Sequence, residues 1–559
     1  MQLSVQFHGA RTGGRLFVLV HGWQHAPKNL ADLIAAVRES FPEDDVLLPC
    51  YPSSTWSNGD LCLVAEYCVQ QIQEAWEKHR KAGYREVVLI GHSLGALLAR
   101  KTYLIAHGKY SEYPIEGAAP EKREWADRIQ RLVLLSGMNR GWKLYPKNKY
   151  TPPRVWLWRL LLLTAARVTH RGTLVRSAYR GAPFVVNLRL DWLELMHAGV
   201  QPALVVQLAG TRDTVIDPTD HIDLLSGANF RYLSVEGTSH HAMVRFDDTE
   251  AGRERKRKFL RALQDAPAVL KNEISLNVER PDPDVQQVVL LLHGIRDQGG
   301  WTEELLKEIE AGGALREQKV KGRIGNYGYL PLLPFLVGLG RRRHLLQFMD
   351  LYAEARAAFP KAKCSFVGHS NGTYLMATAL SRYVSCRFDR VAFIGCILHR
   401  RFGWIDRMSG RVGRVRNYVA TDDWVVAIFP SFFESVRIFP FNRDFGSAGH
   451  TGFTQVSDRF ENVRFIEGDH GAGLETRNRP ALLSFLLADE PETAPLIVPA
   501  QRARTVTLHK MCTYIWILLL AGVVALFYGA TRLNGYMGYP WPVVQALYVL
   551  VLIFVFFRY

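Results

Sequence analysis

Two serines in the chain share one short pattern, with a glycine two positions before and two positions after each. Residues 87–95 read VVLIGHSLG around Ser93, and residues 364–372 read CSFVGHSNG around Ser370. In both, an apolar run ends at the first glycine and helical periodicity begins after the serine. Such a strand-to-helix turn presents the serine hydroxyl above the sheet, and the small neighbours let strand and helix approach each other. The pattern therefore predicts a nucleophilic serine in each half of the chain.

A serine nucleophile needs a general base, and that base needs an acid to orient it. In the first half, Asp213 follows the apolar run ALVVQLAG, and His240 follows FRYLSVEG. Both are expected at the C-terminal ends of strands, where parallel sheets build their sites. We therefore predict Asp213 as the acid and His240 as the base for Ser93. The competing candidates are Asp217, Asp220 and His241.

The acid and base of the second half follow from aligning it with the first. When ATDDWVV is aligned with GTRDTVI, Asp423 corresponds to Asp213. When IEGDHGAGL is aligned with VEGTSHHAM, His470 corresponds to His240. Asp423 and His470 are therefore the predicted partners of Ser370. The alternatives here are Asp422 and His450.

Backbone amides are the predicted donors to the oxyanion that forms during attack. One donor in each half is the residue after the serine, at the helix N-terminus. The other lies in the loop after an early strand, at HGW (21–23) and HGI (293–295). The predicted donors are Trp23, Leu94, Ile295 and Asn371. His21 and His293 precede the nucleophile in the chain, and we interpret them as shaping these loops.

The elements that must position these residues occur twice in the same order. Splitting the 559-residue chain near 264–276 gives two halves with matching apolar runs, such as FVLVHGW and VVLLLHGI. Runs rich in valine, isoleucine and leucine suit strands buried on both faces of a parallel sheet, and helical periodicity separates them. This predicts an α/β doubly wound fold, mostly parallel and present twice. The predicted boundaries are 1–265 and 275–490, followed by a linker over 491–511.

The two halves differ in where they carry extra residues. Between nucleophile and acid the first half has 120 positions and the second only 53. We predict a lid insertion at about 138–200, including RVWLWRLLLLTAARV (154–168), which is too short and too arginine-rich to span a membrane. An ordinary core helix is the alternative. The second half carries IFPSFFESVRIFPF (428–441) between acid and base, which suits an apolar acyl pocket or a domain contact.

The C-terminal region 512–559 predicts a transmembrane hairpin. Residues 513–530 and 541–557 contain no charge, and each is about as long as a bilayer helix requires. The basic flanks place both ends of the hairpin, and the domains before it, on the cytoplasmic side. These flanking residues are Arg502, Arg504, Lys510 and Arg558. The alternative is a buried apolar hairpin within the soluble fold.

The amino-acid composition limits the kinds of binding partner and the cellular compartment that we expect. The formal net charge is +16, with basic runs such as RERKRK (253–258), which read either as solvated surface or as attraction to an anionic membrane. No nucleic-acid-binding motif accompanies the charge. The seven cysteines show neither metal-ligand nor disulfide spacing, which favours a reducing compartment, and no export signal precedes the first apolar run. We therefore expect no metal, no cofactor and no nucleic-acid partner.

These motifs together resemble the α/β-hydrolase superfamily, in particular its lipase- and esterase-like members. The resemblance covers about 1–262 and 280–487 and implies two tandem α/β-hydrolase domains followed by two transmembrane helices. It implies ester or thioester hydrolysis in which serine attacks, histidine takes and returns the proton, and aspartate holds the imidazole. The expected protein is a membrane-anchored serine hydrolase acting on lipid or acyl esters. A soluble-substrate esterase, an acyltransferase, and a tethered scaffold with one or both domains inactive remain alternatives.

Overall fold

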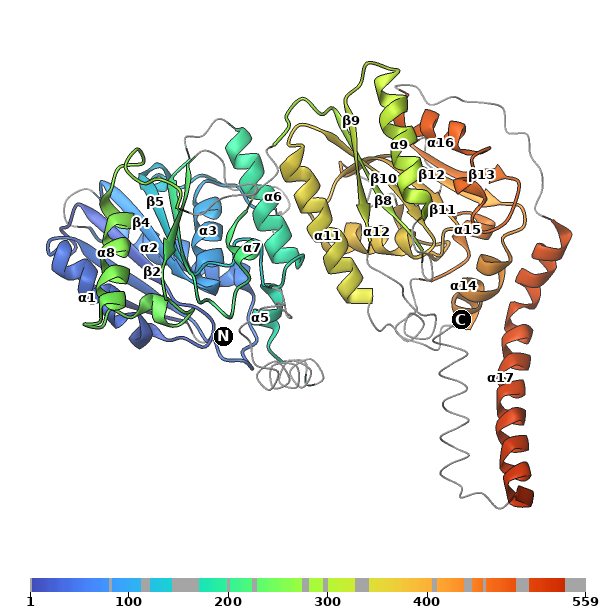
Figure 1. Ribbon diagram of the computed structural model, residues 1–559, viewed down its shortest axis with the longest axis horizontal. Helices are drawn as coiled ribbons and strands as arrows, with labels where there is room; N and C mark the ends of the chain where they lie inside the picture. Colours follow the sequence, from blue (N-terminus) through green and yellow to red (C-terminus); the bar gives the residue numbers. More distant parts are fainter. Residues whose placement is uncertain are drawn as a thin grey trace. The chain divides into compact units, whose positions relative to one another are not determined.

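The computed structural model divides the chain into two compact units, Met1–Pro281 (unit 1) and Asp282–Tyr559 (unit 2). Each unit is a sheet covered by helices (Figure 1). The structure describes residues 3–79, 83–111, 121–142, 169, 171–198, 202–223, 229–273, 281–294, 300–326, 341–404, 410–436, 445–455, 459–488 and 502–537.

Unit 1 contains a seven-stranded sheet in the order β1-β3-β2-β4-β5-β6-β7. Neighbouring strands are parallel except for β1, which pairs antiparallel with β3 at the edge. Strands β2 and β4 are almost wholly buried, as the runs of valine and leucine predict for strands covered on both faces. The strands are β1 (Ser4–His8), β2 (Arg15–Val20), β3 (Asp45–Cys50), β4 (Glu86–His92), β5 (Ile129–Leu135), β6 (Leu204–Gly210) and β7 (Phe230–Val235).

Helices cover both faces of the unit 1 sheet because alternate strand residues point to opposite sides. Phe17, Leu19 and Ile90 pack in one core cluster with residues of α1 and α8, whereas α3 packs against both α2 and α6 (Figure 1). The helices described in unit 1 are α1 (Ala31–Ser40), α2 (Leu61–Glu77), α3 (Leu94–Ala106), α5 (Thr173–Ser177), α6 (Pro183–His197), α7 (Pro218–His221) and α8 (Glu250–Gln264).

Unit 2 contains a six-stranded sheet in the order β13-β12-β11-β10-β8-β9, and all neighbouring strands are parallel. Taken in chain order, these six strands occupy the same positions as β2 to β7 of unit 1, which adds only β1 at its edge. The order of apolar runs in the sequence thus corresponds to the same strand order in both sheets. The strands are β8 (Gln287–Leu292), β9 (Val320–Gly325), β10 (Lys363–His369), β11 (Phe388–Ile394), β12 (Val412–Ala420) and β13 (Phe460–Ile466).

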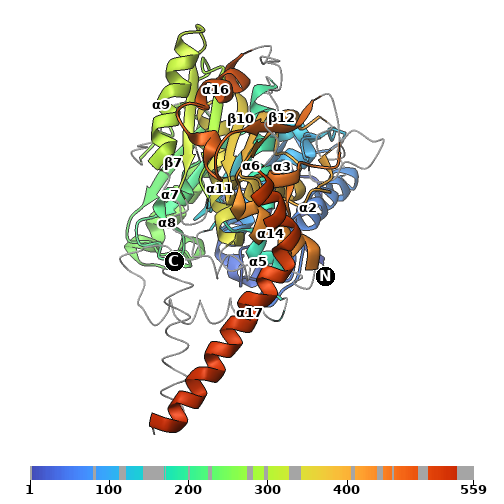
Figure 2. The same cartoon turned by 90° about the vertical axis from the view of Figure 1, so that its right-hand side faces the viewer.

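The helices of unit 2 also lie on both faces of its sheet. Helices α9 and α16 share a core cluster with the strands, while α11 and α12 pack together against β9 and β10. The last helix that the structure describes, α17 (Ala503–Met537), runs out from the unit and away from the sheet (Figure 2). The helices described are α9 (Gly300–Ala314), α11 (Arg341–Ala358), α12 (Asn371–Arg382), α14 (Trp424–Val436), α15 (Ala448–Thr451), α16 (Arg479–Leu487) and α17 (Ala503–Met537).

Two predicted boundaries need correction. Unit 1 continues beyond residue 265, because Leu270 is buried in its core and the amide of Glu273 donates to the carbonyl of Tyr232 over 2.8 Å. The predicted linker over 491–511 is helical from Ala503, because the first turns of α17 pack against α14.

The predicted lid insertion is in part a packed helix. Helix α6 contacts α3 and is buried along nearly its whole length. Lys101 on α3 forms a 3.1 Å ion pair with Asp191, and Arg189 forms a 2.9 Å ion pair with Asp223, all four side chains being buried. Buried charges are tolerated only when paired in this way. The apolar segment 154–168, on which the lid prediction depended, lies outside the described residues.

One described helix is long and apolar enough to cross a membrane, over Ala503–Leu526 in α17. It includes much of the predicted first span, 513–530. Large apolar side chains along it are exposed, among them Leu518 and Leu526, each 70% exposed. The predicted second span, 541–557, lies outside the described residues, so the hairpin stays a prediction.

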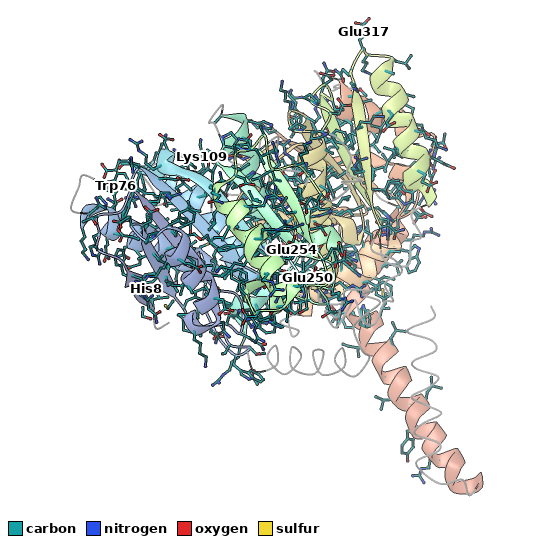
Figure 3. All side chains as sticks on the ribbon, turned by 60° about the vertical axis from the view of Figure 1, so that its left-hand side comes forward. His8, Trp76, Lys109, Glu250, Glu254 and Glu317 are labelled. Carbon is teal, nitrogen blue, oxygen red and sulfur yellow. The ribbon has the colours of Figure 1, made fainter. Side chains whose placement is uncertain are left out.

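The basic run on α8 is largely neutralised by acids of its own unit. Glu250 and Glu254 lie one turn apart on this helix (Figure 3). Lys256 pairs with Glu39 over 2.7 Å, Arg257 with Glu254 over 2.5 Å and Lys258 with Glu273 over 2.5 Å. This balance favours the interpretation of RERKRK as solvated surface.

Gly372 tests the packing of the second strand-to-helix turn. A Cβ there would lie 2.7 Å from the carbonyl oxygen of Leu292, whereas a Cβ on Gly300 would meet no atom within 4 Å. Gly372→Ala is therefore expected to destabilise unit 2 by about 1–3 kcal/mol. The matched control Gly300→Ala, also in the first turn of a helix, should have no effect or stabilise slightly. Thermal unfolding of the full chain in detergent measures both, and equal midpoints would contradict this account.

Candidate active sites

Both serines adopt the same uncommon backbone conformation. Ser93 has φ 55° and ψ −116° between β4 and α3, and Ser370 has φ 50° and ψ −114° between β10 and α12. A positive φ is unfavourable for a residue with a side chain, and such strain persists only where the surroundings enforce it. Each serine therefore occupies the tight turn that its sequence pattern predicts.

The glycines around Ser93 are required by close backbone contacts. A Cβ on Gly91 would lie 2.3 Å from the carbonyl oxygen of Gly95, and a Cβ on Gly95 would lie 2.1 Å from that of Val20. The start of α3 is thus pressed against the ends of β4 and β2. No residue larger than glycine fits this geometry without movement of the backbone.

In unit 1 the predicted acid and base are hydrogen-bonded to each other. His240, after β7, places its Nδ1 atom 2.8 Å from Oδ2 of Asp213, which follows β6. The other carboxylate oxygen accepts bonds from the amides of Val215 (2.8 Å) and Ile216 (3.0 Å). Burial opposes ionisation, but the hydrogen bond and charge of His240, the charge of His221 and the amide of Ile216 together outweigh it and hold the pKa of Asp213 below its ordinary value. The carboxylate is thus fixed and ionised, as orienting a histidine requires.

Unit 2 repeats this arrangement. Nδ1 of His470, after β13, lies 2.8 Å from Oδ2 of Asp423, after β12. Oδ1 of Asp423 accepts a 2.9 Å bond from the amide of Val426 in the first turn of α14. Burial disfavours the charged imidazole, but the neighbouring Asp423 carboxylate outweighs burial and raises the pKa of His470 above 6.5.

The backbone of each serine is hydrogen-bonded to the end of the next strand in its sheet. The amide of Ser370 donates to the carbonyl of Ile394 over 3.0 Å, at the end of β11. The next residue, Gly395, has φ 56°, and a Cβ there would lie 2.5 Å from the His470 ring. In unit 1, the amide of Ser93 likewise donates to the carbonyl at the end of β5, over 2.9 Å. Ser93, Asp213 and His240, and likewise Ser370, Asp423 and His470, therefore follow the C-terminal ends of parallel strands of one sheet.

The alternative residues of unit 1 have other partners. Asp220 forms a 3.0 Å ion pair with Arg180. The Asp217 carbonyl accepts a bond from the Asp220 amide over 2.8 Å, a backbone contact that does not involve the Asp217 carboxylate. Nδ1 of His241 lies 3.2 Å from Nε2 of His25. The geometry therefore favours Asp213 and His240 as the acid–base pair.

In unit 2, the alternative acid faces away from the base. Asp422 pairs with Arg502 and Arg504 at the start of α17. The ring of His450 lies 4.9 Å from that of His509, and burial, with His509 adding to it, lowers the pKa of His450 to about 4. The geometry therefore favours Asp423 over Asp422 as the acid and His470 over His450 as the base.

Sequence reasoning missed the histidine that precedes each serine. Nε2 of His92 lies 3.1 Å from the backbone oxygen of His240, and since a carbonyl only accepts, His92 must donate. Burial, reinforced by the nearby His240 and His25, lowers the pKa of His92, which keeps its ring neutral. In unit 2 the His369 ring lies 4.8 Å from the His470 ring. The signal was present in the sequence, because both copies read Gly-His-Ser.

A second histidine adjoins the acid of unit 1 and was also missed. His221, on α7, has Nε2 3.9 Å from Oδ2 of Asp213 and Nδ1 2.9 Å from the carbonyl oxygen of Gly137. This carbonyl fixes the proton on Nδ1 in the neutral ring. His221 lies on a four-residue helix with no motif around it, so only the fold brings it to Asp213.

The predicted oxyanion loops begin beside the serines. A Cβ on Gly22 would lie 2.9 Å from Cβ of Ser93, and a Cβ on Gly294 would lie 3.0 Å from Cβ of Ser370. Trp23 follows Gly22 directly, and Leu94 and Asn371 open the helices α3 and α12. Ile295 lies outside the described residues. In unit 1, His21 accepts from the amide of Tyr51 and stacks on its ring, which fixes the loop.

Among the residues that the structure describes, no cluster of three or more His, Cys, Asp or Glu side chains could hold a metal ion.

Comparison with known proteins supports the superfamily. Residues 17–252 match the sequence model of the Alpha/beta hydrolase family, which supports an α/β-hydrolase assignment for unit 1. The chain also resembles a lipase-esterase related protein from Clostridium acetobutylicum, at 12% identity and TM-score 0.30, over 46% of this chain and 98% of the other. An esterase from Exiguobacterium antarcticum matches at 14% identity and TM-score 0.29, over 47% and 96%. No curated protein matches the sequence.

The raised pKa of His470 predicts a pH dependence of stability in unit 2. A protonated His470 beside Asp423 stabilises the folded state below pH 6.5, and this contribution disappears as pH rises through the raised folded-state value. His470→Gln should therefore lower the unfolding midpoint of unit 2 more at pH 5.5 than at pH 8.5. Calorimetry of the two proteins at both values measures this difference. A loss independent of pH would contradict the assignment of the ion pair.

Proposed function

We propose that the chain is a membrane-anchored serine hydrolase with two sites, which cleaves carboxylic esters of lipids or other acyl compounds. The observation that carries the proposal is the 2.8 Å Asp–His hydrogen bond found in each unit, at strand ends next to a serine of positive φ. The same arrangement twice in one chain favours two working sites over a scaffold. The family match over 17–252 supports hydrolase chemistry in unit 1.

In the proposed reaction, the serine Oγ attacks the ester carbonyl while the histidine Nε2 takes the hydroxyl proton. The aspartate keeps the Nδ1 proton in place and stabilises the imidazolium that forms. Amides of Trp23 and Leu94 in unit 1, and of Ile295 and Asn371 in unit 2, would donate to the oxyanion. The histidine returns its proton to the leaving alcohol, and water then releases the acyl group by the reverse sequence. An alcohol in place of water would make the reaction an acyl transfer.

A lipid substrate is proposed because the chain carries its own apolar helix. Helix α17 exposes large side chains over several turns, which in water would be costly and in a bilayer are favourable. Trp516 and Tyr514 lie near the start of this exposed stretch, where aromatic residues favour the membrane interface. The anchor would hold both units close to lipid esters.

A fluorophosphonate probe tests the two serines in the same chain. Full-length protein in detergent should be labelled at both sites, Ser93→Ala and Ser370→Ala should each retain one label, and the double variant none. Asp213→Asn in the Ser370→Ala background should slow the remaining label by about 10⁴-fold, as loss of the orienting acid does in a serine triad.

Asp217→Asn in the same background is the matched control and should change the rate little. Absence of label on the wild-type chain would contradict hydrolase function, and would favour the scaffold. Label that disappears with a single serine substitution would leave one working site.

Arginine substitutions test the anchor. Leu518→Arg with Leu526→Arg should release the chain from membranes under alkaline extraction, because each arginine costs about 2.5–3.5 kcal/mol at the centre of an inserting helix. Leu315→Arg is the control, since Leu315 is 86% exposed at the end of α9 and outside α17. Full retention of the double variant in the membrane would contradict anchoring by α17.

A further inference from the structure

The start of α17 binds the loop that carries the acid of unit 2. Nε of Arg504 donates to Oδ1 of Asp422 over 2.8 Å, its Nη2 donates to Oδ2, and Arg502 donates to Oδ2 over 3.2 Å. Because Arg504 presents two parallel donors to one carboxylate, the contact fixes direction as well as distance. Asp422 is the residue directly before Asp423, so this contact acts on the acid loop itself.

The contact continues through buried backbone bonds. The amide of Arg502 donates to the carbonyl of Thr421 over 3.0 Å. The hydroxyl of Thr505, which is fully buried, lies 2.8 Å from the carbonyl oxygen of Arg502 and 3.3 Å from that of Thr421, and shares its one proton between them. Exposed ion pairs alone contribute little to stability. The hydrogen bonds of Thr421 therefore matter, because they lock the first turn of α17 to the end of β12.

The acid loop is bonded in turn to the loop that carries the base. The amide of Asp422 donates to the carbonyl of Gly468 over 2.9 Å, and the amide of Gly468 donates to the hydroxyl of Thr421 over 3.2 Å. Gly468 is two residues before His470. A shift of Asp422 would therefore move both members of the acid–base pair.

Helix α14, which begins directly after Asp423, packs against α17. Nδ1 of His509 lies 3.0 Å from Oγ of Ser431, and the Trp516 ring stacks on Phe432 at 5.0 Å. The segment 428–436 thus contacts α17 within unit 2.

The pairing is specific to unit 2. The residue before the acid of unit 1 is Arg212, whereas unit 2 has Asp422 at the corresponding position. Two adjacent carboxylates would compete for one histidine unless one of them is held elsewhere, and Arg502 and Arg504 do this. The hydrogen bond from Arg504, reinforced by both positive charges, keeps the pKa of Asp422 below its ordinary value, so it remains ionised and turned toward α17.

We infer that Arg502 and Arg504 are positioning residues for the site of unit 2: by holding Asp422 on α17, they direct Asp423 toward His470 and make the anchor helix part of that site. This inference rests on the proposed function for its catalytic consequence. Its structural content, the dependence of both loops on α17, is independent of catalysis.

The test uses the full-length chain with Arg502→Ala and Arg504→Ala, combined with Ser93→Ala to isolate the label on Ser370. Labelling of Ser370 should slow by about 3- to 30-fold, the range that coupling through a packed network produces. The labelling rate should also rise at a lower pH than in the parent chain. The reason is that a His470 imidazole held less tightly by Asp423 loses its proton more easily. The same pair of substitutions combined with Ser370→Ala should leave labelling of Ser93 unchanged.

Amide hydrogen exchange measures the mobility of the two loops and does not depend on a reaction at Ser370. Amides of residues 421–427 and 466–470 should exchange faster in the double variant, and Arg502→Lys with Arg504→Lys should restore part of the protection. Lys510→Ala is the matched control, since Lys510 is an exposed basic residue two turns further along α17.

The outcomes distinguish a failure of the proposed catalysis at Ser370 from a failure of the positioning role of Arg502 and Arg504. If wild-type Ser370 takes no label while exchange of both loops rises in the variant, catalysis in unit 2 is refuted and the positioning role stands. If exchange of both loops and the pH at which labelling rises are unchanged, the positioning role is refuted whether or not Ser370 reacts.

Discussion

Both sites depend on one constraint, the close contact between the end of a central strand and the start of the helix that follows it. At this point the serine takes a positive φ, and the flanking glycines leave no room for a side chain. The strain is local, but the parallel sheet around it holds the turn because strands and helices on both sides are packed. Since neighbouring parallel strands end at the same edge, the residues predicted as acid and base lie at the same edge of the sheet as the serine.

Both units contain the same strand-to-helix contact at the serine, but different residues surround the Asp–His pair in each unit. Unit 1 surrounds its base with further histidines, and His92 donates to the backbone of His240 while His221 adjoins Asp213. Unit 2 instead connects its acid loop to α17 through Asp422. The shared strand order sets the geometry of each candidate site, and the residues outside it determine which other segments each site contacts.

The sequence was sufficient for features that repeat or depend on local pattern. Apolar runs located the parallel strands, and the Gly-x-Ser-x-Gly patterns located both turns, because these features are encoded within a few residues. The choice of Asp423 over Asp422 could be made only by alignment within the chain. What the sequence could not give were contacts between distant segments, such as His221 with Asp213 or α6 with α3. The helical start at Ala503 was missed for the same reason, because its first turns are stabilised by partners about 80 positions earlier.

If α17 enters the bilayer, its contact with α14 also sets the height of the second site. Helix α14 has 13 residues and runs alongside α17 from Asp423, so at 1.5 Å per residue it covers about 20 Å. Its last turns lie against Trp516, near the position where the side chains of α17 become exposed. Because both helices are packed rather than joined by a flexible linker, the distance from Asp423 to that position is fixed. A site held at a fixed height can select substrates by how far they extend from the membrane, which a freely tethered domain cannot do.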